Sequence, residues 1–121
     1  MTRGAKVMHL ERVLLADGER IGLESTYLSV QRFGWLRRSF DPTTSLYAAI
    51  RESGVRFDAA LERIETALPS PREAALLGTT TAMPVLMLNR RTTDAAEEPI
   101  EFVRALYRGD RVAFEALLTD R

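Results

Sequence analysis

"PVLMLNRRTTDAAEEPIEFVRALYRGDRVAF" spans residues 84–114 and contains two extended apolar runs separated by a polar connection. Valine, isoleucine, leucine and phenylalanine fill the runs, and Asp, Ala and Glu fill the connection. This pattern predicts two strands joined by a polar turn, with a last extended piece after Gly109-Asp110. Paired strands need a partner layer for their apolar side, so this stretch predicts a sheet with other elements packed on it.

The second run, residues 99–111, has two different faces because side chains alternate along a strand. One face is apolar and is expected to face the core; it consists of Ile100, Phe102 and Leu106. The other face carries Glu101 and Tyr107. A polar face of this kind is typical either of a strand that lines a polar cavity or of a strand exposed to solvent. Exposure is the more common state in antiparallel sheets.

A hairpin is predicted over residues 6–28, where two extended segments flank Asp17-Gly18. Asp-Gly between such segments is a strong hairpin signal because both residues tolerate positive φ. Arg12 and Glu24 lie on the two arms of this hairpin. They either meet a polar ligand together or simply pair across the strands.

A helix is predicted within residues 41–54, with Thr44 or Ser45 as its N-cap and Gly54 as its stop. Ser45 has two readings. A hydroxyl beside the free N–H groups of a helix start holds phosphate or carboxylate well, and the same hydroxyl also serves as a plain cap.

A second helix is predicted over residues 70–78, where Ser70 and Glu73 form a capping box and Gly78 ends the helix. Residues 55–69 are ambiguous, but the spacing of their apolar residues favours a helix, because intervals of four, three and four separate Phe57, Leu61, Ile64 and Leu68. Residues 31–40 predict a short helical turn or a loop that covers part of the core, and their arginines predict a solvated rim. The total, about five strands and at least two helices, predicts an α+β domain with a mainly antiparallel sheet.

Composition limits the function. The chain has 121 residues, enough for one domain, with 17 basic and 17 acidic residues and no cysteine. A neutral chain is a poor DNA binder, and the absence of cysteine excludes disulfides and thiolate sites. His9 is the only histidine and lacks metal-ligand spacing, so neither a metal nor a cofactor is expected. No apolar stretch approaches the roughly 20 residues of a membrane span, and we expect a cytoplasmic protein with no membrane partner.

Four ordered motifs resemble one family. Residues 84–114 are similar to the signature of the UTRA domain, in which a strand ending in Arg-x-Thr-x-Asp leads to Pro-Ile-Glu and then to Tyr-Arg-x-Asp-Arg. "LLADGERIGLESTYL" (14–28), "DPTTSLYAAIRESGV" (41–55) and "PREAALLG" (71–78) match further motifs of that family in order. The UTRA domain is the effector-binding domain of HutC-type regulators in the GntR family of bacterial transcription factors.

This resemblance implies the fold of chorismate lyase, an antiparallel sheet with helices packed against it. It also implies that the segment from Phe57 to Leu68 is a strand, against its helical spacing. In sugar-phosphate-responsive members, the residues equivalent to Arg12, Ser45 and Tyr47 grip the phosphate. Those equivalent to Glu24, Glu101 and Tyr107 contact the rest of the ligand. Because six strand residues span about 20 Å, Glu101 and Tyr107 are expected to meet one small ligand only where the strand bends or bulges.

The chain departs from the family pattern at two positions. Leu14 stands where phosphate-responsive members have a second arginine, which makes a carboxylate or neutral ligand more plausible. Glu97 stands where the turn usually has glycine. We read residues 1–121 as one UTRA domain without its winged helix-turn-helix and with its first strand missing or shortened, which indicates a piece of a longer protein or a truncated product.

The predicted function is therefore a non-enzymatic, effector-sensing and dimerisation domain of a transcription regulator. Its expected partners are a sugar phosphate, carboxylate or related polar metabolite and a second copy of the chain. DNA contact is expected only through the missing N-terminal domain. Two alternatives stay open: a chorismate lyase-like enzyme, and a dimerisation module without a working effector site. Fold sharing alone does not support catalysis.

Overall fold

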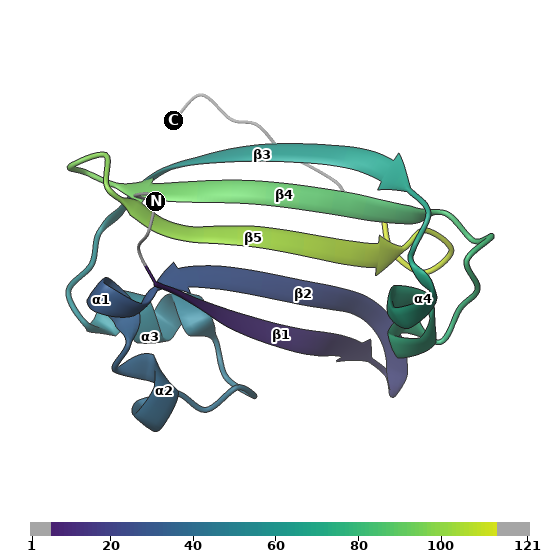
Figure 1. Ribbon diagram of the computed structural model, residues 1–121, viewed down its shortest axis with the longest axis horizontal. Coiled ribbons are helices and arrows are strands. Elements are labelled where there is room, and N and C mark those ends of the chain that lie inside the picture. Colours follow the sequence, from purple (N-terminus) through teal and green to yellow (C-terminus); the bar gives the residue numbers. More distant parts are fainter. Residues whose placement is uncertain (1–5, 114–121) are drawn as a thin grey trace.

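The computed structural model describes residues 6–113 and shows one five-stranded antiparallel sheet with strand order β1-β2-β5-β4-β3 (Figure 1). The strands are β1 (Val7–Ala16), β2 (Glu19–Ser29), β3 (Phe57–Ala67), β4 (Val85–Asp94) and β5 (Pro99–Arg108). The helices are α1 (Val30–Phe33), α2 (Leu36–Ser39), α3 (Leu46–Glu52) and α4 (Pro71–Leu77). The predicted α+β class is confirmed.

The predicted hairpin is confirmed as β1 and β2. Its turn residues Asp17 and Gly18 have φ values of 51° and 78°, which is the left-handed region that Asp-Gly turns require. The register shifts once, between Leu14 and Leu15. This irregularity lies close to the turn, so Arg12 and Glu24 remain directly opposite each other in the regular part of the ladder.

Both predicted helices are confirmed. Ser45, rather than Thr44, is the N-cap of α3, because its side chain accepts a hydrogen bond from the Ala48 N–H. The capping box of α4 is complete between Ser70 and Glu73. These helices begin where short-range hydrogen bonds satisfy their first N–H groups, which is why their starts were predictable.

The helical spacing of residues 55–69 gave a wrong prediction, and the strand implied by the family resemblance is confirmed as β3. β3 pairs with β4 along its length. Leu61 and Ile64, which supported the helical reading, are 73% and 46% exposed. The ladder with β4 has therefore overridden both the spacing and the helical propensity of this segment.

The sheet has two faces, which we name after residues of β5. The Glu101 face carries Glu101, Val103, Ala105 and Tyr107, and beside them Arg12, Glu24, Thr26, Arg90 and Thr92. The Phe102 face carries Phe102, Arg104 and Leu106, and beside them Tyr27 and Arg91.

Helices cover opposite ends of these two faces (Figure 1). The first three helices bury an apolar cluster against the Glu101 face; it contains Leu28, Phe33, Leu36, Leu46, Ile50 and Ile100. α4 buries a second cluster against the Phe102 face; it contains Leu23, Leu77, Val85 and Leu106. Each face of β5 is thus part of a core.

The solvent reading of the polar face of residues 99–111 is wrong. Glu101 is 5% exposed, and Val103 and Ala105 are fully buried. β5 is a central strand, with β2 on one side and β4 on the other, and α3 brings Tyr47 against its start. The polar face therefore lies among other side chains rather than in solvent.

The segment 31–40 forms α1 and α2, and its Phe33 and Leu36 cover the core as predicted. The prediction that its arginines form a solvated rim is wrong for Arg32, because Arg32 pairs with Asp94 at the end of β4. The extended piece predicted after Gly109-Asp110 lies mostly outside the described residues. No helix within residues 6–113 is long and apolar enough to span a membrane.

Candidate functional site

Arg12 and Glu24 are paired at one side of the Glu101 face. Arg12 Nη2 donates to Glu24 Oε1 at 2.6 Å, and both side chains are about four-fifths buried. Arg12 Nη1 also donates to the backbone carbonyls of Pro42 and Thr44, at 3.4 and 3.2 Å. The arginine thus joins the first hairpin to the loop that leads into α3, and the predicted cross-strand pair is present.

Ser45 and Tyr47 reach this region from the start of α3. Ser45 directly follows Thr44, whose carbonyl holds Arg12, and its Oγ accepts from the Ala48 N–H at 3.2 Å. Ser45 is exposed, so its capping role leaves it open to a ligand. Tyr47 is half-buried and points to the other end of the site.

Glu101 is the centre of a buried polar group. Its Oε1 accepts from Thr92 Oγ1 and from Arg90 Nη2, each at 3.2 Å. The Tyr47 side chain lies beside Thr92 and Glu101. Burial raises the pKa of Tyr47, and the neighbouring Glu101 raises it further. The phenol therefore stays protonated and can donate to the carboxylate.

Arg90 links this group to the rest of the face. Its guanidinium lies 5.1 Å from the centre of the Tyr47 ring and 3.5 Å from the exposed carboxylate of Glu62. Burial alone would lower the pKa of Arg90, but Glu101, Tyr47 and Glu62 together raise it above its usual value. The side chain is therefore a permanent cation.

Tyr107 lies at the opposite end of the face, against Gly22. A Cβ placed on Gly22 would be only 2.9 Å from Cδ1 of the Tyr107 ring, so glycine makes room for the ring. Burial raises the pKa of Tyr107, the Glu24 carboxylate raises it further, and Arg90 lowers it. Tyr107 therefore lies close enough to both Glu24 and Arg90 for their charges to change its pKa.

The expected bulge between Glu101 and Tyr107 is not present. The pairing of β5 is regular from Glu101 to Tyr107, and the register shift lies before Glu101, opposite Thr92 and Thr93. The six predicted site residues thus form two groups on one face: Arg12, Glu24, Ser45 and Tyr107 at one side, and Tyr47 and Glu101 at the other. Arg90 lies between them.

Sequence reasoning missed Arg90 and Thr92, which both form hydrogen bonds with Glu101. Both stand in the Arg-x-Thr-x-Asp motif at residues 90–94, where alternation places them on one face of the strand. The ladder then sets Thr92 opposite Glu101 and Arg90 opposite Val103. The usable signal was an arginine and a threonine two residues apart on a strand next to the one that carries Glu101.

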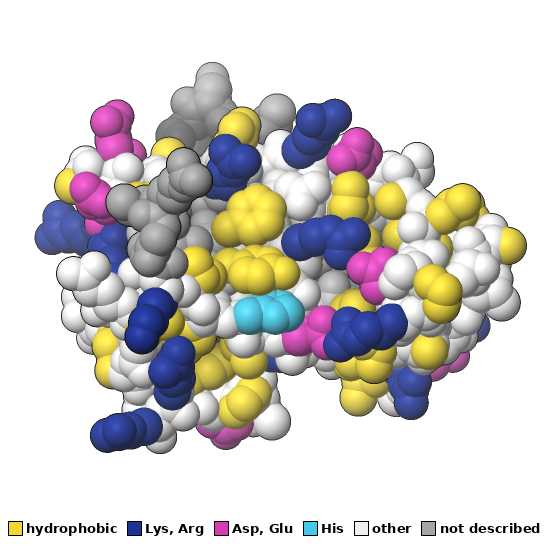
Figure 2. All heavy atoms as spheres, in the orientation of Figure 1, with side chains coloured by type: hydrophobic (Ala, Val, Ile, Leu, Met, Phe, Trp, Pro, Cys, Tyr) yellow, Lys and Arg dark blue, Asp and Glu magenta, His cyan; other side chains and the backbone are white. Residues whose placement is uncertain are grey.

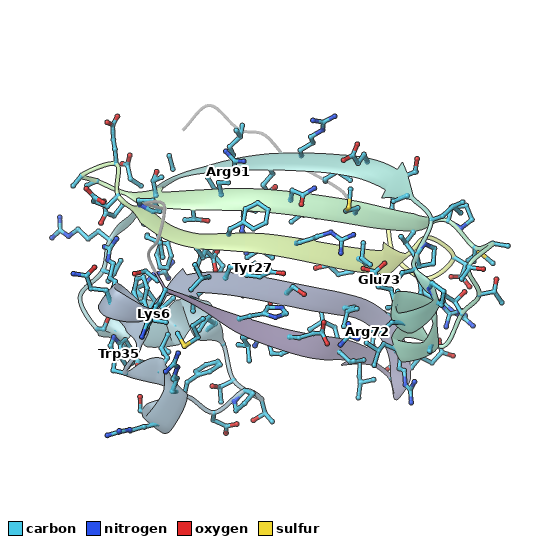
Figure 3. The ribbon with its side chains drawn as sticks, viewed as in Figure 1. Lys6, Tyr27, Trp35, Arg72, Glu73 and Arg91 are labelled. Atoms are coloured by element: carbon cyan, nitrogen blue, oxygen red, sulfur yellow. The ribbon has the colours of Figure 1, made fainter. Side chains whose placement is uncertain are left out.

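A hollow lies mainly on the other side of the sheet. It has a volume of about 780 Å³ and includes Tyr27, Phe102, Arg91 and Arg104 in its lining. Figure 2 shows this face, with His9 in cyan beneath a row of hydrophobic side chains, and Figure 3 labels Tyr27 and Arg91 there. Of the six predicted site residues, only Glu101 borders it. Within residues 6–113 no group of three His, Cys, Asp or Glu could hold a metal ion.

Comparison with known proteins gives the family. A model of the UTRA domain matches residues 1–113. The chain belongs to the UTRA domain family. It is 50% identical over 115 residues to the transcriptional repressor PhnF of Mycolicibacterium smegmatis, covering 95% of this chain and 47% of that protein. The repressor NagR of Bacillus subtilis is 28% identical over 111 residues, covering 91% and 45%. The chain thus spans about half the length of these two relatives.

Solved structures of regulator domains share this fold. The effector domain of PhnF from Mycobacterium smegmatis superimposes with a TM-score of 0.92 at 50% identity, covering 97% of this chain and 72% of that one. The C-terminal domain of the histidine utilization repressor from Pseudomonas syringae gives 0.86 at 22% identity, covering 99% and 84%, which shows the shared fold. These comparisons confirm the resemblance, the fold and the function class, an effector-binding regulatory domain.

Proposed function

We propose that the Glu101 face is the effector site of this UTRA domain and that its ligand is a polar metabolite carrying an oxyanion. The observation that carries this proposal is the pairing of buried acids and bases on one sheet face, Arg12 with Glu24 and Arg90 with Glu101. Buried ion pairs contribute little to net stability, because desolvation offsets their attraction. A binding role explains two such pairs on the same face better than a stabilising role does.

Arginine is suited to this ligand class because its planar guanidinium matches phosphate and carboxylate geometry. The exposed Ser45 hydroxyl at the start of α3 adds a group that bonds the same oxyanion. Leu14 pairs with Gly22 and shares the face of Arg12, so the position of the family's second arginine contributes an apolar wall here. The site therefore suits a carboxylate or a sugar phosphate bound through Arg12.

We also propose that the chain works within a longer dimeric regulator, in which a separate domain contacts DNA. Two observations support this. The relatives are repressors about twice as long as this chain, and its own charges balance at 17 basic and 17 acidic residues. Light scattering should give twice the 13.6 kDa mass of the chain, and titration with promoter DNA should show no saturable binding. A stable monomer would contradict the dimer, and sequence-dependent DNA binding would contradict the division of roles.

A thermal-shift screen tests the effector site. Sugar phosphates, carboxylates, amino acids and inorganic anions are added to the chain, and a ligand of the native state raises the melting temperature by mass action. We expect a subset of oxyanions to do so, and conversion of none of them to product. Conversion of a stabilising compound to product would favour the chorismate lyase-like alternative. If no compound raised the melting temperature, a dimerisation module without an effector site would be favoured.

A further inference from the structure

We propose that Arg90 is a second cation of the effector site, so that the ligand binds between Arg12 and Arg90 through two separate acceptor groups, at least one of them anionic. This inference rests on the proposed function, and it names a ligand contact outside the set predicted from the sequence. Within residues 6–113 two buried side-chain donors lack any acceptor, and they are Nε of Arg12 and Nε of Arg90.

Such donors are uncommon, because a buried N–H without a partner costs about 1–3 kcal/mol. Here both belong to arginines, and both arginines lie on the Glu101 face. A ligand that accepts a hydrogen bond from such a donor would remove this cost. The two Nε groups therefore indicate two acceptor positions in one site.

The register places the two arginines on either side of a common floor. Arg12 is aligned with Glu24 and Ala105, and Arg90 is aligned with Val103 and Thr26, one row further along. Three strand spacings separate β1 from β4, or roughly 15 Å between the two backbones. Val103 and Thr26 lie between the two arginines and are each 1% exposed, so other side chains cover them. A small molecule bound between the two arginines meets one guanidinium from each side.

Glu101 and Glu62 hold Arg90 in position while leaving its Nε available. Glu101 takes a hydrogen bond from Nη2, and Glu62 lies near Nη1, so neither carboxylate uses Nε. The half-buried Tyr47 ring lies over the same guanidinium. Arg90 thus supplies from β4 the cation that Leu14 does not supply from β1.

Arg90→Lys is the variant that tests the contact. Lysine keeps the positive charge beside Glu101 but removes the Nε–H and the planar fork. The matched control is Arg91→Lys, the same change at the next residue of β4, whose side chain lies on the Phe102 face over the Phe102 ring. A structural role for Arg90 that depends on its charge alone would survive the change to lysine.

The probes are inorganic phosphate and succinate, a phosphate and a dicarboxylate, titrated into the ¹⁵N-labelled chain while the arginine Nε–H resonances are followed by NMR. With one of the probes we expect the Arg12 and Arg90 resonances to shift together and with one dissociation constant. Arg90→Lys should weaken that binding ten- to a hundredfold, and Arg91→Lys should leave it within about twofold. The probe that binds distinguishes a phosphate site from a carboxylate site.

Two results would overturn the proposal while leaving the effector site intact: a shift of the Arg12 resonance alone, or wild-type affinity in Arg90→Lys. If neither resonance responds to either probe, the inference and the proposed site both fail. The resonances are measured in the wild-type chain, so a folding defect in Arg90→Lys does not decide the outcome.

Discussion

The Tyr107 ring lies across the backbone of β2 at Gly22, so closely that a Cβ on Gly22 would be 2.9 Å from its Cδ1. This contact directs the phenol along the Glu101 face toward Glu24. A strand glycine often marks such a close approach, and here the approach fixes the position of a predicted ligand residue.

Gly22→Ala should displace the ring and destabilise the domain by about 1–3 kcal/mol, as overpacking does in a core. Urea unfolding measures the loss. In a Tyr107→Ala background the same change should cost much less, because the ring is gone. Additive costs of the two substitutions would contradict the contact.

Glu101→Gln should destabilise the domain by about 1–3 kcal/mol, because it leaves the charge of Arg90 without its buried partner. Glu62 also pairs with Arg90 but is exposed, so Glu62→Gln should cost less than about 1 kcal/mol. Chemical denaturation of both variants compares the two carboxylates. Equal costs would show that burial of Glu101 does not strengthen its pairing.

Glu97 has a φ of 63°, a left-handed conformation that costs a residue with a Cβ roughly 1–2 kcal/mol. Glu97→Gly should therefore raise the free energy of unfolding by up to about 1 kcal/mol, since greater freedom of the unfolded chain offsets part of the gain. The neighbouring Glu98→Gly is the control and should not stabilise. A loss of stability in Glu97→Gly would mean that the Glu97 side chain contributes to the turn.

Asp94 should make stability depend on acid pH. The hydrogen bond from Arg32, with others from the Glu98 and Ala96 N–H groups, holds the pKa of Asp94 below its ordinary value of 3.8. A depressed pKa stabilises the fold above the unfolded value, and this contribution is lost as pH falls through the folded value. The stability difference between wild type and Asp94→Asn should therefore shrink below about pH 4. A difference that stays constant from pH 6 to pH 3 would contradict this account.

Sequence reasoning succeeded where the decisive contacts are local. The Asp17-Gly18 turn and the α4 capping box depend on residues within a few positions of one another, so their patterns identify them. The spacing of Leu61 and Ile64 predicted a helix wrongly. These residues form a strand because β3 pairs with β4, whose residues opposite them are more than twenty positions away in the sequence. Local propensity carries no information about such a partner.

The sequence predicted which residues belong to the candidate site, but it did not predict how they are arranged in space. The family motifs name Arg12, Glu24 and Glu101, but only the sheet order places them on one face. The burial of Glu101 depends on docking of α3 and on Arg90 from β4, contacts that alternation within residues 99–111 cannot reveal.

Calorimetric titration of a thermal-shift hit into wild type, Arg12→Ala and Arg72→Ala determines whether the effector binds at Arg12. Arg72 (Figure 3) pairs with Glu11, which lies on the opposite face of β1 from Arg12, so Arg72→Ala removes a more exposed arginine–glutamate pair outside the site. Loss of one charge-assisted contact costs about 1.5–3 kcal/mol, so Arg12→Ala should weaken binding roughly ten- to a hundredfold, with Arg72→Ala close to wild type. Equal affinities in all three proteins would show that the effector does not bind on the Glu101 face.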